Sequence, residues 1–227
     1  MNILSVIPAR SGSKGVKNKN IIMVNSKPLI YYTIAKSLKC KLINTTFVST
    51  DSIKIANLAK SFGAEVPFLR PKKLATDKSN VLETVLHAVR SMENYKKIKY
   101  NIILVLQPTS PLREVSDITK CIKMIMSKKY DSVITVSEYK GISPYILYSK
   151  NGNYSKLLIN NNYFQRQEYQ KTYFRNGLVY AIDKNILNKY KSFYGKKLGT
   201  HLIPNHRSIN VDTTKDLNNL KKKFVKI

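Results

Sequence analysis

The chain has 227 residues, and 43% of them are hydrophobic, which suits one domain with a real core and argues against a second independent domain. It carries 40 lysine and arginine residues against 13 aspartate and glutamate residues, a net charge of +27. Because the basic residues are spread along the whole chain, they argue against a specific nucleic-acid partner, and no apolar run approaches the ~18 residues of a membrane helix.

The two cysteines, Cys40 and Cys121, are too few for a disulfide framework and have no nearby histidine that would suggest a metal site. Both lie in apolar-periodic segments, so we expect buried free thiols. The N-terminal apolar run is interrupted by Pro8 and Arg10 before it could serve as a signal peptide. We therefore expect a cytoplasmic protein with no membrane partner.

Strands and helices alternate over the first ~140 residues. The apolar runs that predict strands lie at 1–7, 42–49, 65–69, 101–106 and 131–137. The segments with helical periodicity lie at 28–38, 52–62, 80–95 and 117–126. This order predicts a three-layer α/β/α fold with a mainly parallel sheet and right-handed crossovers.

The alternation fails after residue 137, because residues 145–173 are polar and aromatic without a helical period. A strand at 177–182, a short helix at 184–190, a strand at 200–203 and a closing helix at 214–224 follow. We expect a single domain over residues 1–227 with an inserted arm at about 140–170.

Three polar clusters follow predicted strands, at residues 10–20, 107–113 and 210–212. Ligands of open parallel sheets bind beyond the carboxyl ends of the strands, so we expect these clusters to meet on one rim. The first cluster belongs to IPARSGSKGVKNKN (7–20), which lacks both standard phosphate-binding glycine patterns. Its glycines still allow close approach to an anion, and Arg10, Lys14 and Lys19 supply charge.

Six segments in order along the chain resemble the acylneuraminate cytidylyltransferases, the CMP-sialic acid synthetases. They are IPARSGSKGVKNKNI (7–21), KPLIYYTI (27–34), VSTD (48–51), LRPKKLATD (69–77), LQPTSPLR (106–113) and INVDTTKDL (209–217). The resemblance implies a nucleotidyltransferase (Rossmann-like) fold. It also implies a reaction in which CTP and a nonulosonic, sialic-type sugar acid give a CMP-sugar and pyrophosphate for surface-glycan synthesis.

The resemblance implies a role for each matching residue. The residues implied at the reacting phosphates are Arg10, Lys19 and Asp212. The nucleotide-binding residues are Ala9, Arg10, Ser13, Lys14, Gly15, Asn20, Arg70, Asp77 and Asn80. The sugar-binding residues are Gln107, Arg166, Arg175, Tyr180 and Phe193. Arg70 could instead be a solvated loop residue, Tyr180 could be core, and Tyr194 could replace Phe193 as the inward aromatic residue.

Two positions depart from the family pattern. The family shows two aspartates that hold Mg²⁺ near the final strand, but this chain has Asn210 and Asp212, so one negative charge is lost while both side chains still point the same way. The family often has a basic residue where Phe174 stands. Either Arg175 takes its place, or the substituents of the sugar meet a more apolar wall.

The resemblance also implies a homodimer built through the arm, whose tyrosines suit a buried interface or a cover for the sugar. Two other functions stay open. One is a nucleic-acid-binding or catalytically decayed protein on the same fold, and the other is a nucleotidyltransferase for a different sugar, such as a neutral sugar 1-phosphate.

Overall fold

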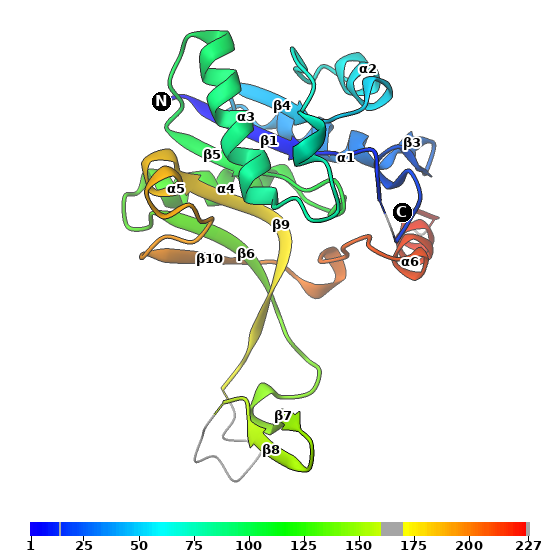
Figure 1. Ribbon diagram of the computed structural model, residues 1–227, viewed down its shortest axis with the longest axis vertical. Coiled ribbons are helices and arrows are strands. Elements are labelled where there is room, and N and C mark those ends of the chain that lie inside the picture. Colours follow the sequence, from blue (N-terminus) through cyan, green and yellow to red (C-terminus); the bar gives the residue numbers. More distant parts are fainter. Residues whose placement is uncertain (14, 160–169, 226–227) are drawn as a thin grey trace.

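The computed structural model describes residues 1–13, 15–159 and 170–225. A six-stranded sheet lies at its centre, in the strand order β10-β6-β9-β5-β1-β4 (Figure 1). The strands are β1 (Ile3–Pro8), β4 (Thr45–Ser49), β5 (Ile102–Val105), β6 (Ser132–Glu138), β9 (Tyr173–Asp183) and β10 (Leu198–Leu202). Only β9 runs antiparallel to its neighbours β5 and β6, so within the described residues the sheet is mainly parallel, as predicted.

Helices cover both faces of the sheet, which confirms the three-layer prediction. Helices α1 (Leu29–Lys39), α2 (Ile53–Ser61) and α4 (Val115–Met126) contribute to one apolar core, which also contains the buried thiols of Cys40 and Cys121. Helices α3 (Val81–Lys96) and α5 (Lys184–Tyr190) contribute to the other. Strands β1 and β5 are buried over almost their whole length because helices cover both of their faces, which explains their continuous apolar runs.

A third, smaller core joins the two ends of the described chain. Helix α6 (Thr214–Val225) contributes Leu217 and Leu220, which pack with Val24 and Leu29. The short hairpin β2 (Met23–Val24) and β3 (Lys27–Pro28) connects the loop after β1 to α1. No helix in the described part of the chain has both the length and the apolar character needed to cross a bilayer.

The predicted strand at 65–69 is wrong. Only an isolated bridge joins Glu65 to Phe47, and the segment then leaves the sheet. Pro67 and Pro71 explain this departure, since proline has no backbone N–H to donate to a neighbouring strand. The helix predicted at 117–126 begins earlier, at Val115, because Glu114 and Asp117 form a capping box at the start of α4.

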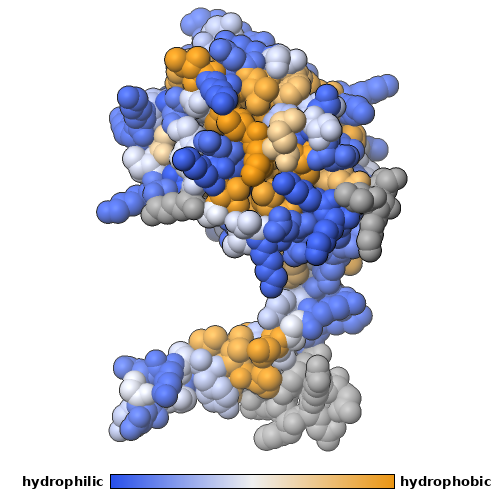
Figure 2. Space-filling model, turned by 90° about the vertical axis from the view of Figure 1, so that its right-hand side faces the viewer, coloured by the Kyte–Doolittle hydropathy of each residue, from blue (hydrophilic) through white to orange (hydrophobic). Residues whose placement is uncertain are grey.

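An arm projects from the sheet where β6 and β9 run on beyond the body (Figure 1). Near its end the strands β7 (Tyr148–Asn151) and β8 (Tyr154–Leu157) form an antiparallel hairpin. An apolar patch lies on the arm (Figure 2), where Ile142, Ile146 and Leu158 are each more than half exposed. The predicted arm at about 140–170 falls in this region, and residues 160–169 lie outside the described ranges.

Candidate active site

A cavity of about 420 Å³ opens beyond the carboxyl ends of β1 and β5. All three polar clusters expected on one rim contribute to its wall. The predicted residues that line it are Arg10, Ser13, Gly15, Lys19, Asn20, Arg70, Gln107 and Asp212. Segments that lie far apart in the sequence thus supply one concave, basic surface.

The loop after β1 is held in shape by its own polar side chains. The Asn20 amide donates to the Arg10 carbonyl over 2.9 Å, and the Ser13 hydroxyl donates to the Val16 carbonyl over 2.7 Å. Ala9 is buried and its N–H donates to the Ser49 carbonyl on β4. These contacts shape the loop without using its positive charges, which stay available to the cavity.

Both cations predicted at the phosphates pair with carboxylates in this structure. Arg10 Nη1 lies 2.6 Å from Asp77 Oδ1, and Lys19 Nζ lies 2.8 Å from Asp212 Oδ1. An anionic ligand that enters the cavity therefore competes with two carboxylates for these cations. Lys14, predicted in the same loop, lies outside the described residues.

Gly15 brings this loop against the segment that carries Asp212. A Cβ atom at Gly15 would collide with the backbone carbonyl oxygen of Asp212, so a side chain at this position would force the two segments apart. The glycine predicted to approach an anion thus also permits close approach between two parts of the chain.

Arg70 is buried, with 6% of its surface exposed, so the alternative of a solvated loop residue is wrong. Its guanidinium donates to the Ser49 carbonyl and the Thr84 hydroxyl, both over 3.1 Å. Burial lowers the pKa of Arg70, although the Asp51 carboxylate opposes the shift. Arg70 thus joins β4 to α3 while it lines the cavity.

The two other residues predicted at the nucleotide, Asp77 and Asn80, each make a polar contact with a neighbouring residue. Asp77 does not line the cavity but pairs with Arg10, which does. Asn80 is the N-cap of α3, where its side-chain oxygen accepts from the Leu82 N–H over 2.9 Å, and its neighbours Ser79 and Val81 line the cavity. The sequence did not single out Ser79 or Val81, although both flank this helix start.

A second cavity of about 380 Å³ adjoins the first, and Gln107 lines both. Its other lining residues include Phe174, Arg175, Tyr180 and Asn210. Phe174 and Arg175 both lie at its wall, so the two alternatives for this position stay open. The sequence-predicted Arg166 lies outside the described residues.

Aromatic side chains support the second cavity. Tyr180 lies against Phe193 with ring centroids 5.7 Å apart, and burial raises the pKa of the Tyr180 hydroxyl. The Arg175 guanidinium donates to the Tyr194 hydroxyl and also lies over its ring. Phe193 and Tyr194 are both partly buried and neither lines either cavity; Phe193 contacts Tyr180, and Tyr194 contacts Arg175, at the wall of the second cavity.

Asn210 and Asp212, the two residues predicted at the metal, lie in contact with each other. The Asn210 amide nitrogen donates to Asp212 Oδ2, while Asn210 Oδ1 is buried without a hydrogen-bond partner among the described residues. A carboxylate and an unpaired amide oxygen fit Mg²⁺ when phosphate oxygens and waters complete its shell. Within the described ranges, no group of three or more His, Cys, Asp or Glu side chains is placed to hold a metal.

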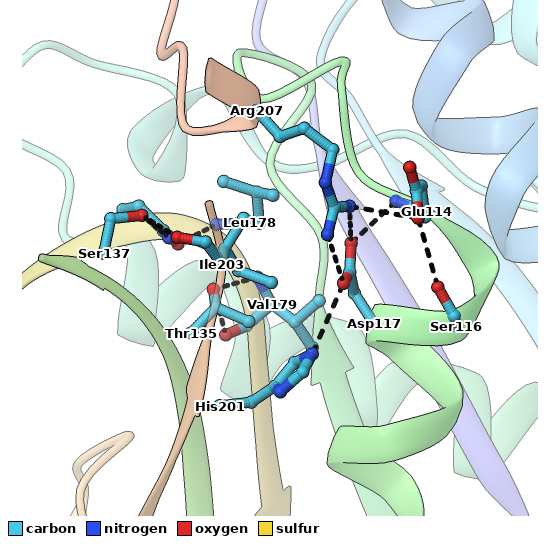
Figure 3. Close-up of polar contacts among 11 residues, drawn as sticks. Glu114, Ser116, Asp117, Thr135, Ser137, Leu178, Val179, His201, Ile203 and Arg207 are labelled. Carbon is cyan, nitrogen blue, oxygen red and sulfur yellow. Dashed lines mark hydrogen bonds and ion pairs between the residues drawn. The ribbon is translucent and has the colours of Figure 1, made fainter. Parts of the chain in front are cut away.

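An ion-pair network around the buried Asp117, which the sequence did not predict, supports the segment that leads to Asn210 (Figure 3). Asp117 is 2% exposed and accepts two hydrogen bonds from Arg207, over 2.6 and 3.2 Å. His201 Nε2 lies 3.3 Å from the same carboxylate, and Arg207 also pairs with Glu114. The network ties α4 to the short helix η5 (Asn205–Arg207), just before Asn210.

Comparisons with known proteins agree with this geometry. The family model described as Cytidylyltransferase matches residues 4–223. An N-acylneuraminate cytidylyltransferase of Escherichia coli O18:K1:H7 is 32% identical over 94% of this chain, which spans half of that protein's length. A CMP-N,N'-diacetyllegionaminic acid synthase of Legionella pneumophila is 34% identical over 95% of this chain and 93% of its own.

The fold has a solved counterpart. A structure of CMP:2-keto-3-deoxy-manno-octonic acid synthetase complexed with CTP superimposes with a TM-score of 0.76 at 15% identity, covering 100% of this chain and 99% of that chain. At this identity the likeness bears on the fold alone, and it confirms the expected nucleotidyltransferase architecture.

Proposed function

The chain belongs to the cytidylyltransferase family, and we propose that it transfers CMP from CTP to a nonulosonic, sialic-type sugar acid with release of pyrophosphate. The observation that carries the proposal is the pair of adjoining cavities with Gln107 in the shared wall. One cavity offers cations to a triphosphate, and the other offers amide, guanidinium and aromatic groups to a sugar acid. The relatives named above act, by their names, on sugar acids of this class.

The reaction requires positioning and charge neutralisation more than covalent chemistry by the protein. The anomeric hydroxyl of the sugar acid attacks the α-phosphorus of CTP, a new O–P bond forms, and the bond to the β-phosphate oxygen breaks. Arg10 and Lys19 are placed to neutralise the charge that develops on the leaving pyrophosphate. Gln107 is placed to orient the sugar beside the nucleotide.

The nucleotide exchanges partners with the protein as it binds. Its phosphates replace Asp77 at Arg10 and Asp212 at Lys19, so the cations keep a counter-charge throughout. Release of Asp212 from Lys19 frees a carboxylate oxygen beside the unpaired oxygen of Asn210. Binding of the triphosphate would thereby free one of the two residues that we propose to hold Mg²⁺.

Mg²⁺ is the cofactor that we propose, and Asp212 and Asn210 are the residues that would hold it. When bound, the ion would supply positive charge to the phosphates. We also propose a homodimer built through the arm, whose exposed apolar side chains suit an interface. The cytoplasmic location expected from the sequence stays a prediction.

The experiment that tests the function measures pyrophosphate release with CTP, UTP, GTP and ATP, each against N-acetylneuraminic, legionaminic, pseudaminic and Kdo-type acids. We expect release only with CTP, Mg²⁺ and a suitable acid together. A neutral sugar 1-phosphate serves as the competing substrate. If no acid yields a CMP conjugate, or if the sugar 1-phosphate yields a CDP-sugar, the proposal is wrong.

A further inference from the structure

Arg113, the last residue of LQPTSPLR, is a fully buried cation outside both cavity walls. The described residues provide no direct ion-pair partner for it, and burial lowers its pKa to about 9, while the Asp117 carboxylate opposes the shift. A buried charge of this kind is costly to the fold unless each of its donors is used. The partners of Arg113 therefore indicate what it does.

Each nitrogen of the Arg113 guanidinium donates to a different element. Nε donates to the Leu178 carbonyl on β9 over 2.5 Å, and Nη1 donates to the Thr33 hydroxyl on α1 over 3.0 Å. Nη2 donates to the Gln107 carbonyl at the end of β5 over 2.9 Å. The rigid fork of arginine suits such a three-way bridge, which lysine cannot reproduce.

The contact with Leu178 falls where β9 is irregular. The register of β9 against β6 shifts between Ile134 and Val136, and Gly177 has a positive φ of 75°. Side chains satisfy peptide groups there. The Asn176 side chain accepts from the Leu178 N–H. Thr135 accepts from the Val179 N–H (Figure 3). Arg113 satisfies the Leu178 carbonyl and so helps to hold the irregularity in place.

The contact with Gln107 holds the other side of the second cavity, which we call the sugar cavity because we propose that it binds the sugar acid. The Gln107 carbonyl also accepts from the Thr33 hydroxyl over 3.4 Å and from the Ser110 N–H over 3.3 Å. The side chain of Gln107 lies against the irregularity, because a Cβ at Gly177 would be 3.6 Å from Gln107 Oε1. One guanidinium thus joins the backbones of both walls of the sugar cavity.

We propose that Arg113 is a positioning residue that sets the spacing between Gln107 and the β9 irregularity, and so determines how well the sugar acid binds without touching it. This inference rests on the proposed function for the identity of the ligand. The anchoring of the two backbones can be tested without any ligand.

The variants are Arg113→Lys, which keeps the charge but not the fork, and Thr33→Val, which removes one hydroxyl from the same network. Ser37→Ala is the matched control, since Ser37 is an equally buried hydroxyl on α1 that contacts Thr46 and not this network. We expect both test variants to raise KM for the sugar acid about tenfold, the size of one buried charge-assisted hydrogen bond. KM for CTP should change less than about twofold, and the control should change neither.

A double-mutant cycle with Gln107→Ala separates positioning from general destabilisation. If Arg113 acts through Gln107, Arg113→Lys has little further effect on KM for the sugar acid in the Gln107→Ala background. The inference is wrong if the effects of Arg113→Lys and Gln107→Ala on KM for the sugar acid multiply fully. It is also wrong if Ser37→Ala raises this KM as much as Thr33→Val does.

Amide hydrogen exchange supplies the readout that needs no substrate. In Arg113→Lys, exchange should rise locally in segments 106–112 and 174–180, relative to Ser37→Ala. A rise spread evenly over the sheet, or none, means that Arg113 does not anchor these walls. If wild-type protein yields no CMP conjugate with any acid, the proposed function fails, and the exchange result alone decides the anchoring.

Discussion

Lys19 Nζ lies 2.8 Å from Asp212 Oδ1, although 193 positions separate the two residues in the sequence. The pair joins the loop after the first strand to the segment before the last helix. It places the predicted leaving-group cation and the predicted metal carboxylate in direct contact, and the roles of these two residues can be separated by experiment.

Lys19→Ala should lower kcat about 100-fold or more, since it removes a charge that acts on the leaving group, and should leave KM for the sugar acid nearly unchanged. Steady-state kinetics with both substrates varied measures this. Lys17→Ala is the control, because Lys17 is an exposed lysine of the same loop outside the cavity wall. An unchanged kcat in Lys19→Ala would refute the role.

Asn210→Asp should lower the half-saturating Mg²⁺ concentration several-fold, because a second carboxylate adds charge to the donor pair. Mg²⁺ titrations of activity and of direct Mg²⁺ binding in the presence of CTP both report the change. Asn205→Asp adds the same charge at an exposed position nearby and serves as the control. Equal curves for Asn210→Asp and wild type would place the metal elsewhere.

Gly15→Ala should reduce the free energy of unfolding by about 1–3 kcal/mol and lower activity, because the new methyl group would meet the Asp212 carbonyl. Gly12→Ala in the same loop is the comparison, since its Cβ would meet only Arg10 Nη1 at an ordinary 3.9 Å. Chemical denaturation measures both variants. Equal destabilisation would mean that the contact with Asp212 is unimportant.

Ser11→Ala should change the pH dependence of stability. Burial tends to raise the pKa of Asp51, but hydrogen bonds from the Ser11 hydroxyl and N–H outweigh it and leave the pKa below its usual value. A lowered carboxyl pKa stabilises the fold above the ordinary pKa, and this stability is lost as the pH falls through the folded-state value.

Ser11→Ala should therefore cost about 0.5–1.5 kcal/mol at pH 7, a difference that narrows below about pH 4. Denaturation curves from pH 7 to pH 2.5 measure it, with Asp51→Asn as the variant that removes the titrating group. If the free-energy difference between Ser11→Ala and wild type stays constant over this pH range, Ser11 does not act through the ionised Asp51 carboxylate.

Local pattern and position in the chain were enough to predict the layers of the fold and the rim. Apolar runs closed by glycine or proline marked β1 and β5, and the rule for parallel sheets placed the loops that follow them together. The direction of β9 was not predictable, because the apolar run GLVYAI is the same in a parallel or an antiparallel strand.

The contacts that refine the site join residues distant in the sequence. Asp117 meets Arg207 across 90 positions, and no local pattern connects them apart from the capping box that places Asp117 at the start of α4. Arg113 belonged to a recognised segment, yet its bond to Leu178 falls at the β9 irregularity, which becomes visible only when the sheet is assembled.

The arm begins at the β9 irregularity, beyond which β6 and β9 pair again. This pairing continues out to Glu138 and Tyr173, past Phe174 and Arg175 at the sugar cavity. The strand that forms the base of the arm is therefore also part of the wall of this cavity. Phe174 and Arg175 belong both to the base of the arm and to the cavity wall, so a contact that moved the base of the arm would also change the shape of that cavity.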